Sequence, residues 1–187
     1  MRVSRWGELV LGVIMVCALH GGVRAQHALP VEIGTQAIGI ARISQSDFSV
    51  TSVAIPGGEV LYLPTLYAAI FFTPALAIEP AVTYLHHSAD GGSNWTGAGL
   101  LRLGGYFAGA QRNSPFLYGE VGVLGSGVDS HSDSHGGFGL GGGYRWLVVD
   151  RRLAVRLEAR VRRWAMDPDE TEIGLALAGG IVLGPRR

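Results

Sequence analysis

Apolar and polar residues alternate with a period of two along most of the chain beyond about residue 30, as in β-strands whose two faces meet different surroundings. In the segment 153–166, Leu153, Val155 and Leu157 alternate with Arg156 and Glu158. Turn residues divide this pattern into eight predicted strands, which cover residues 31–43, 59–72, 76–88, 96–110, 116–127, 137–147, 153–166 and 172–184. The pattern therefore predicts an all-β chain.

The predicted connections alternate strictly in length along the chain. Three of them are tight, at 73–75, 111–115 and 148–152. The other four are polar and mostly longer, and they cover 44–58, 89–95, 128–136 and 167–171. An even number of antiparallel strands, with short turns at one end and longer loops at the other, is the layout of a transmembrane barrel. We therefore predict an eight-stranded antiparallel up-and-down transmembrane β-barrel.

Alternation alone is consistent with two kinds of barrel, whose apolar faces point in opposite directions. A soluble barrel or sandwich, for example one of the lipocalin type, turns its Leu and Val face inward, whereas a membrane barrel turns it outward. Gly and Ala crowd the polar face here, where they weaken a solvated strand but leave room for long side chains in a narrow lumen. Only 16% of the residues are charged, below the roughly 25% of a typical soluble domain. Both observations favour the membrane barrel.

The polar face of the predicted strands carries five Arg and five Glu. These are Glu32, Glu79, Arg102, Glu120, Arg145, Arg156, Glu158, Arg160, Arg162 and Glu172. An isolated ion in a small lumen is costly, and pairing with good geometry recovers that cost. An eight-stranded barrel is just wide enough for its own side chains to fill. We therefore predict an ion-pair network inside a plugged or nearly plugged barrel, and no open diffusion pore.

Aromatic residues gather near the ends of the predicted strands, as expected for rings at the two membrane interfaces. The predicted interface residues are Phe72, Tyr84, Phe116, Tyr144, Trp146 and Trp164.

Residues 1–25 have the pattern of a secretory signal peptide, followed by a barrel domain at 26–187. Arg2 and Arg5 precede an apolar run that is too short to span a membrane comfortably, and Val23 and Ala25 fit a cleavage site before Gln26. The formal net charge is zero, so the electrostatic footprint of nucleic-acid binding is missing.

Candidate chemistry is sparse. The segment 129–135 holds two His residues, His131 and His135, with acidic neighbours, a combination that suits several divalent ions. A plain polar loop is the favoured interpretation, so no metal site, no catalytic residue and no cofactor is predicted. Neighbouring Ser, His and Asp residues in one loop do not form a catalytic triad, because a triad is defined by its geometry in space.

Together with the alternating segments and the Arg- and Glu-bearing face, the segment 116–122 (Phe-Leu-Tyr-Gly-Glu-Val-Gly) resembles the small bacterial outer-membrane β-barrel proteins of the OmpA/OmpX-like family. The resemblance covers essentially all of 31–184. It implies an outer-membrane location in a Gram-negative cell and contact with outer-membrane lipids and lipopolysaccharide. It also implies assembly by the barrel-assembly machinery. Such barrels commonly end in an aromatic residue, whereas the last strand here ends at Leu183-Gly184.

Three functions remain open at this point. The chain is expected to be a structural or surface-interaction barrel and not an enzyme. A narrow channel for small solutes is the first alternative, and a lipid-modifying barrel enzyme is the second. No residue identifies an external ligand.

Overall fold

The computed structural model describes residues 29–45, 48–54, 65–89, 92–128, 131–166 and 169–184. The predicted signal peptide and residues 59–64 of the second predicted strand lie outside them. The regular elements are β1 (Val31–Gln45), β2 (Phe48–Ala54), β3 (Thr65–Phe71), β4 (Leu76–Ala89), β5 (Gly92–Tyr106), β6 (Ser114–Val128), β7 (His131–Val148), β8 (Leu153–Trp164) and β9 (Glu170–Leu183). No helix long and apolar enough to cross a membrane occurs in this part of the chain.

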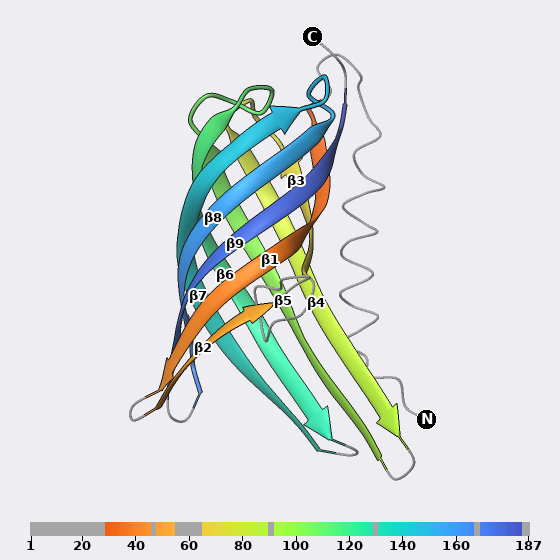
Figure 1. The fold of residues 1–187 in the computed structure, drawn as a ribbon, viewed down its shortest axis with the longest axis vertical. Coiled ribbons are helices and arrows are strands. Elements are labelled where there is room, and N and C mark those ends of the chain that lie inside the picture. Colours follow the sequence, from red (N-terminus) through yellow and green to blue (C-terminus); the bar gives the residue numbers. More distant parts are fainter. Residues whose placement is uncertain are drawn as a thin grey trace.

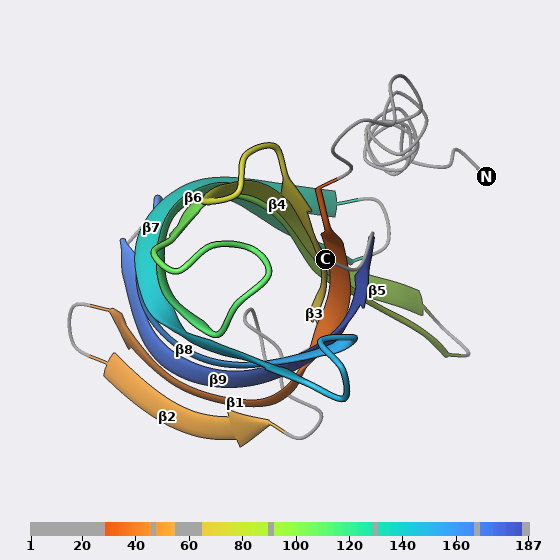
Figure 2. The ribbon, with the colours of Figure 1, turned by 90° about the horizontal axis from the view of Figure 1, so that it is seen from above.

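Eight of these strands form a closed antiparallel barrel, as predicted. Strands β3 to β9 pair in sequence order, and β1 closes the ring because it pairs with both β3 and β9. Figure 1 shows the tilted strands, and Figure 2 shows the ring from above. Every strand of the ring therefore has a partner on each side, which removes the exposed edges of an open sheet.

Strand β2 lies outside this ring and pairs with the distal half of β1, from Gly39 to Gln45. The prediction of a loop over 44–58 was therefore wrong for residues 48–54. The β-branched residues Val50, Thr51 and Val53 favour a strand there. A bulge between Gln36 and Ile38 shifts the alternation of β1 by one residue. Even-numbered positions point into the lumen before the bulge, and the small residues Gly39 and Ala41 do so after it.

Two hairpins extend the barrel at the end opposite the short turns. Strands β4 and β5 pair up to Ala89 and Gly92, and β6 and β7 pair up to Val128 and His131. Most of the predicted loops 89–95 and 128–136 is therefore strand. Their polar composition indicates exposure to solvent, but it does not prevent a hairpin ladder from continuing. The result is a four-stranded extension of β4–β7, which reaches beyond the end of β8 in Figure 1.

The two faces of the wall differ as in a membrane barrel. Large apolar side chains such as Leu103, Leu140 and Val161 are exposed on the outside, while Ala and charged residues are buried inside. This confirms the predicted inversion. A soluble barrel would bury these apolar side chains, because their exposure to water is unfavourable.

The turn at 107–113 closes one end of the barrel. Strand β5 stops at Tyr106, earlier than predicted, and the following residues fold across the lumen (Figure 2). Gly109 adopts a φ of 88°, which favours glycine, and the buried Ala110 donates its N–H to the carbonyl of Pro74 at 2.6 Å. The turn is thus held inward by backbone bonds.

Candidate functional site

All ten predicted ionisable residues project into the lumen, and none is more than 5% exposed. They share one parity within each strand because side chains alternate between the two faces of a sheet. In β8, for example, Arg156, Glu158, Arg160 and Arg162 are buried at every second position, and the residues between them face outward.

Nine of the ten residues form one continuous chain of alternating charges. In order, the chain runs through Arg145, Glu32, Arg156, Glu79, Arg102, Glu120, Arg162, Glu172 and Arg160. The N–O distances along it lie between 2.6 and 3.2 Å. The tenth residue, Glu158, lies 3.6 Å from Nη1 of both Arg102 and Arg156. Charge is thereby balanced throughout the lumen.

Some links of this chain follow directly from strand register. Glu79, Arg102 and Glu120 are direct cross-strand neighbours on β4, β5 and β6. Opposite charges in such positions stabilise a sheet.

Other links cross the lumen and connect distant strands. Nε of Arg145 on β7 lies 2.7 Å from Oε2 of Glu32 on β1, and Arg156 on β8 reaches Glu79 on β4. Arg145 and Arg156 are themselves cross-strand neighbours, an unfavourable juxtaposition that Glu32 relieves because it pairs with both. The network therefore ties opposite walls of the barrel together.

Aromatic rings provide further contacts to the guanidinium groups. The Arg102 guanidinium lies 4.5 Å from the centre of the Tyr118 ring, and that of Arg156 lies 4.5 Å from the Tyr67 ring. The Tyr67 hydroxyl donates a hydrogen bond to Oε1 of Glu32 at 2.9 Å. A planar, delocalised guanidinium can stack on a ring and hold carboxylates with its edge at the same time, which a Lys ammonium cannot do.

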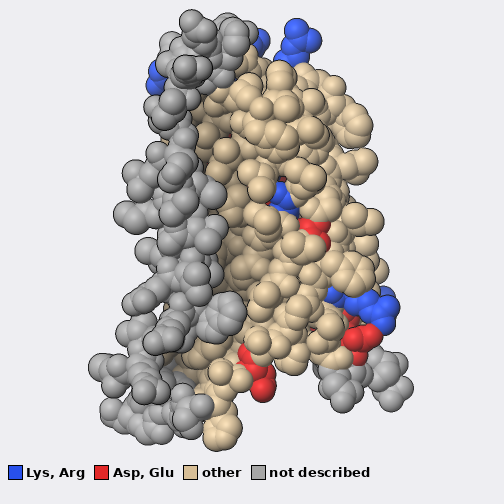
Figure 3. All heavy atoms as spheres, turned by 180° about the vertical axis from the view of Figure 1, so that it is seen from behind, with Lys and Arg blue, Asp and Glu red and all other residues tan. Residues whose placement is uncertain are grey.

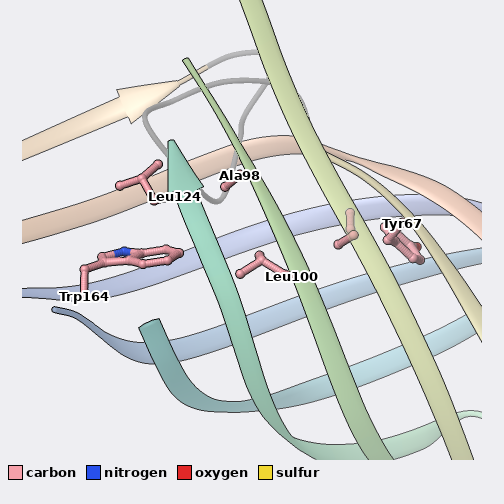
Figure 4. Packing of buried hydrophobic residues seen from close by; sticks show 7 residues of the cluster. Tyr67, Ala98, Leu100, Leu124 and Trp164 are labelled. Carbon is pink, nitrogen blue, oxygen red and sulfur yellow. The ribbon is translucent and has the colours of Figure 1, made fainter. Parts of the chain in front are cut away.

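Apolar and aromatic clusters fill the two ends of the lumen. At the short-turn end, the rings of Phe71, Tyr106 and Phe116 pack together, and Arg145 donates through Nη1 to the carbonyl of Ala110 at 2.8 Å. At the hairpin end, Trp164 belongs to a buried cluster with Leu124, which Figure 4 shows from close by.

Little space remains between these clusters and the ion pairs. A cavity beside Glu79 and Arg102 measures about 10 Å³, roughly the room that one water molecule needs. The ion pairs and the two clusters thus occupy the lumen at these levels, and this cavity has room for about one water molecule.

Comparison with known proteins gives matches in structure alone. No family model matches the sequence, and no curated protein matches it. The fold matches Ail, the attachment invasion locus protein of Yersinia pestis, with a TM-score of 0.53 and 11% identity over 83% of this chain and 99% of Ail. It matches Neisserial surface protein A (NspA) with a TM-score of 0.56 and 12% identity, over 82% of this chain and 96% of NspA. The fold is that of the small outer-membrane β-barrels.

A third small outer-membrane β-barrel has a similar structure. The N-terminal barrel domain of Pseudomonas aeruginosa OprF matches with a TM-score of 0.52 and 11% identity, over 84% of this chain and all of that domain. At these identities the likeness concerns the fold. The Ail structure is a complex with the heparin analogue sucrose octasulfate, and this ligand is a finding about Ail alone.

The predicted aromatic interface was partly wrong. Phe72, Tyr84, Tyr144 and Trp146 are exposed on the outer face, but Phe116 and Trp164 are 2% and 1% exposed and lie inside this outer-membrane-type barrel. A position near the end of a strand indicates the level of a residue along the barrel axis. It does not indicate whether the side chain points into the lumen or outward. The parity that they share with Glu120 and Arg162 in the same strands places Phe116 and Trp164 inside. The same rule finds the lumen residues Tyr106 and Tyr118, which the prediction of the network left out.

The weak metal candidates His131 and His135 do not come together. Both belong to β7, and a strand that rises about 3.3 Å per residue separates positions four apart by about 13 Å. The prediction assumed a compact loop at these residues. Within the described ranges, no group of three or more His, Cys, Asp or Glu residues could hold a metal ion.

Proposed function

We propose that this protein is an integral outer-membrane β-barrel with a closed lumen and a structural or surface-interaction role. The observation that carries the proposal is the continuous ion-pair chain, which joins opposite walls between two packed ends. An open pore needs a water-filled path, and the lumen leaves room for about one water beside Glu79 and Arg102. The likeness to Ail, NspA and OprF supports the outer-membrane location.

The proposal includes the route to that membrane. Export through a cleaved signal peptide at 1–25 and insertion by the barrel-assembly machinery would place the outward Leu, Ile and Val side chains in lipid. The short turns would then face the periplasm, and the β4–β7 extension would face the outside.

The extension is the part of the molecule best suited to meet an external partner. Residues 131–135 of β7 pair with β6, and no described residue pairs with them on the other side, whereas the carbonyl of Gly136 still accepts a hydrogen bond from the N–H of Ala165 beyond β8. In Figure 1 the ends of β4, β5, β6 and β7 reach beyond the end of β8. NspA is named as a surface protein, and Ail as an attachment invasion locus protein, which supports a similar surface role for this chain.

The two alternatives are weaker. A narrow channel for small solutes would require the ion-pair chain to open. A lipid-modifying enzyme would require a nucleophile with a base beside it, and sequence reasoning identified no such pair.

Epitope insertion tests the proposed topology. A tag inserted between Asp129 and Ser130, which follow β6 and precede β7 in the sequence, should bind antibody on intact cells. The matched insertion between Asp150 and Arg151, in a short turn, should bind antibody only after the cells are permeabilised. Both proteins should migrate differently on SDS gels before and after boiling. Labelling of the 150–151 tag on intact cells, or recovery of the untagged protein in the soluble periplasmic fraction, would contradict the proposal.

A further inference from the structure

The outer face of the barrel carries an apolar groove of about 790 Å³. Gly119 on β6 forms part of its floor, between its direct cross-strand neighbours Leu103 on β5 and Leu140 on β7. The large side chains on both sides and the missing one between them produce the depression. A Cβ atom at Gly119 would approach Cδ2 of Leu140 to 3.8 Å, an ordinary contact, so the position has room for a side chain.

Four charged residues line this groove. Arg102, Glu120 and Arg162 are buried members of the lumen network, and only Arg163 exposes its side chain on the outer face. Arg163 on β8 is the direct neighbour of Phe138 on β7 and Thr171 on β9, and all three residues line the groove. The Arg163 side chain is 57% exposed and forms an ion pair with Asp169 through Nη2. A guanidinium has five N–H donors, so it can bind a second acceptor while it keeps this contact.

Charge is rare elsewhere on the same surface. Among the outward-facing positions of the described strands, Arg occurs only at Arg42 and Arg163, both toward the hairpin end, and Asp and Glu do not occur. Figure 3 shows one side of the barrel as a mostly tan surface, with charged atoms gathered near its two ends and only small charged spots between them. The groove thus combines an apolar trough with a cation at its hairpin-end margin.

We propose that this groove binds lipid A, with one acyl chain lying over Gly119 and a lipid A phosphate contacting Arg163. The inference rests on the proposed function, because the proposed topology places the hairpin end of the barrel, and with it Arg163, in the outer leaflet. Apolar walls favour an acyl chain, since burial of apolar surface drives the contact. The planar guanidinium fork matches a phosphate and can hold it with two hydrogen bonds.

The proposal predicts which outward residues matter for lipid binding. Arg163→Gln removes the cation, and Gly119→Leu fills the groove with a side chain. Arg151→Gln is the matched control, because Arg151 is an exposed Arg in the short turn 149–152 at the opposite end.

Binding is measured by native mass spectrometry of the folded protein in detergent, with purified bis-phosphorylated lipid A as the probe. Loss of a charge-assisted hydrogen bond in Arg163→Gln should weaken binding about tenfold. Arg163→Lys should keep part of the affinity, Gly119→Leu should also bind more weakly, and Arg151→Gln should bind like the parent. With dephosphorylated lipid A, the Arg163→Gln variant and the parent should bind alike, while Gly119→Leu should still be weaker than the parent.

The proposal is overturned if Arg163→Gln and Gly119→Leu both bind bis-phosphorylated lipid A as tightly as the parent. It is also overturned if phosphatidylethanolamine binds at the groove as tightly as lipid A does. Heat-modifiable gel migration of each variant verifies that the barrel has folded. The epitope experiment tests the location independently, so a failure of the lipid site and a failure of the proposed function are distinguishable.

Discussion

Replacement of Arg156 by Met is expected to lower the free energy of unfolding by about 3–5 kcal/mol, the usual cost of removing one partner from a buried ion pair. Arg156 is almost completely buried, with Nε 2.6 Å from Oε1 of Glu32 and Nη1 2.7 Å from Oε2 of Glu79. The variant leaves five lumen carboxylates with four guanidinium groups. It also removes a link between β8 and the opposite wall of the barrel.

The measurement is a urea titration of the protein refolded in lipid vesicles and followed by tryptophan fluorescence. Arg151→Met, in an exposed turn, is the control and should change stability by no more than about 0.5 kcal/mol. The double variant Arg156→Met/Glu79→Gln restores neutrality and should recover part of the loss. If Arg156→Met is no less stable than Arg151→Met, the network does not hold the barrel together.

Gly143→Ala is the second variant with a large expected effect. A Cβ atom at Gly143 would overlap the carbonyl oxygen of Leu157 and lie 3.0 Å from Cα of Glu158, both on the neighbouring strand. Backbone atoms cannot rotate away as a side chain can, so β7 and β8 would have to separate. Overpacking of this kind typically costs about 1–3 kcal/mol, and occasionally more.

The fraction of Gly143→Ala that refolds into vesicles, read from its heat-modifiable band, should fall well below that of the parent protein. Gly99→Ala is the matched control on β5, because a Cβ atom there meets no neighbouring atom within 4 Å. Equal refolding of the two variants would show that β7 and β8 are not packed as closely as described.

The faces of the strands could be predicted from the sequence because Arg and Glu recur at every second position. In β8 the run Arg156, Glu158, Arg160 and Arg162 leaves only one parity for the lumen. The same reasoning failed for Phe116 and Trp164, because their place near strand ends was given more weight than the parity that they share with Glu120 and Arg162.

Partners across the lumen could not be predicted, because period-two alternation carries no information about which strands face each other. The pairs Arg145–Glu32 and Arg156–Glu79 depend on the closure of the ring between β1 and β9. The inward turn at 107–113 was also missed, since the apolar residues of 107–110 were assigned to the preceding strand and the polar residues of 111–113 match an ordinary surface turn. Its closure depends on the backbone bond from Ala110 to Pro74, which lies in a different turn.

The most direct test of the closed lumen is single-channel recording of the purified, refolded protein in planar lipid bilayers. The ion-pair chain from Arg145 to Arg160 and the packed ends predict that membranes containing the protein stay at baseline conductance. Large, stable open-pore steps from the parent protein would contradict the closed lumen and would favour the channel alternative.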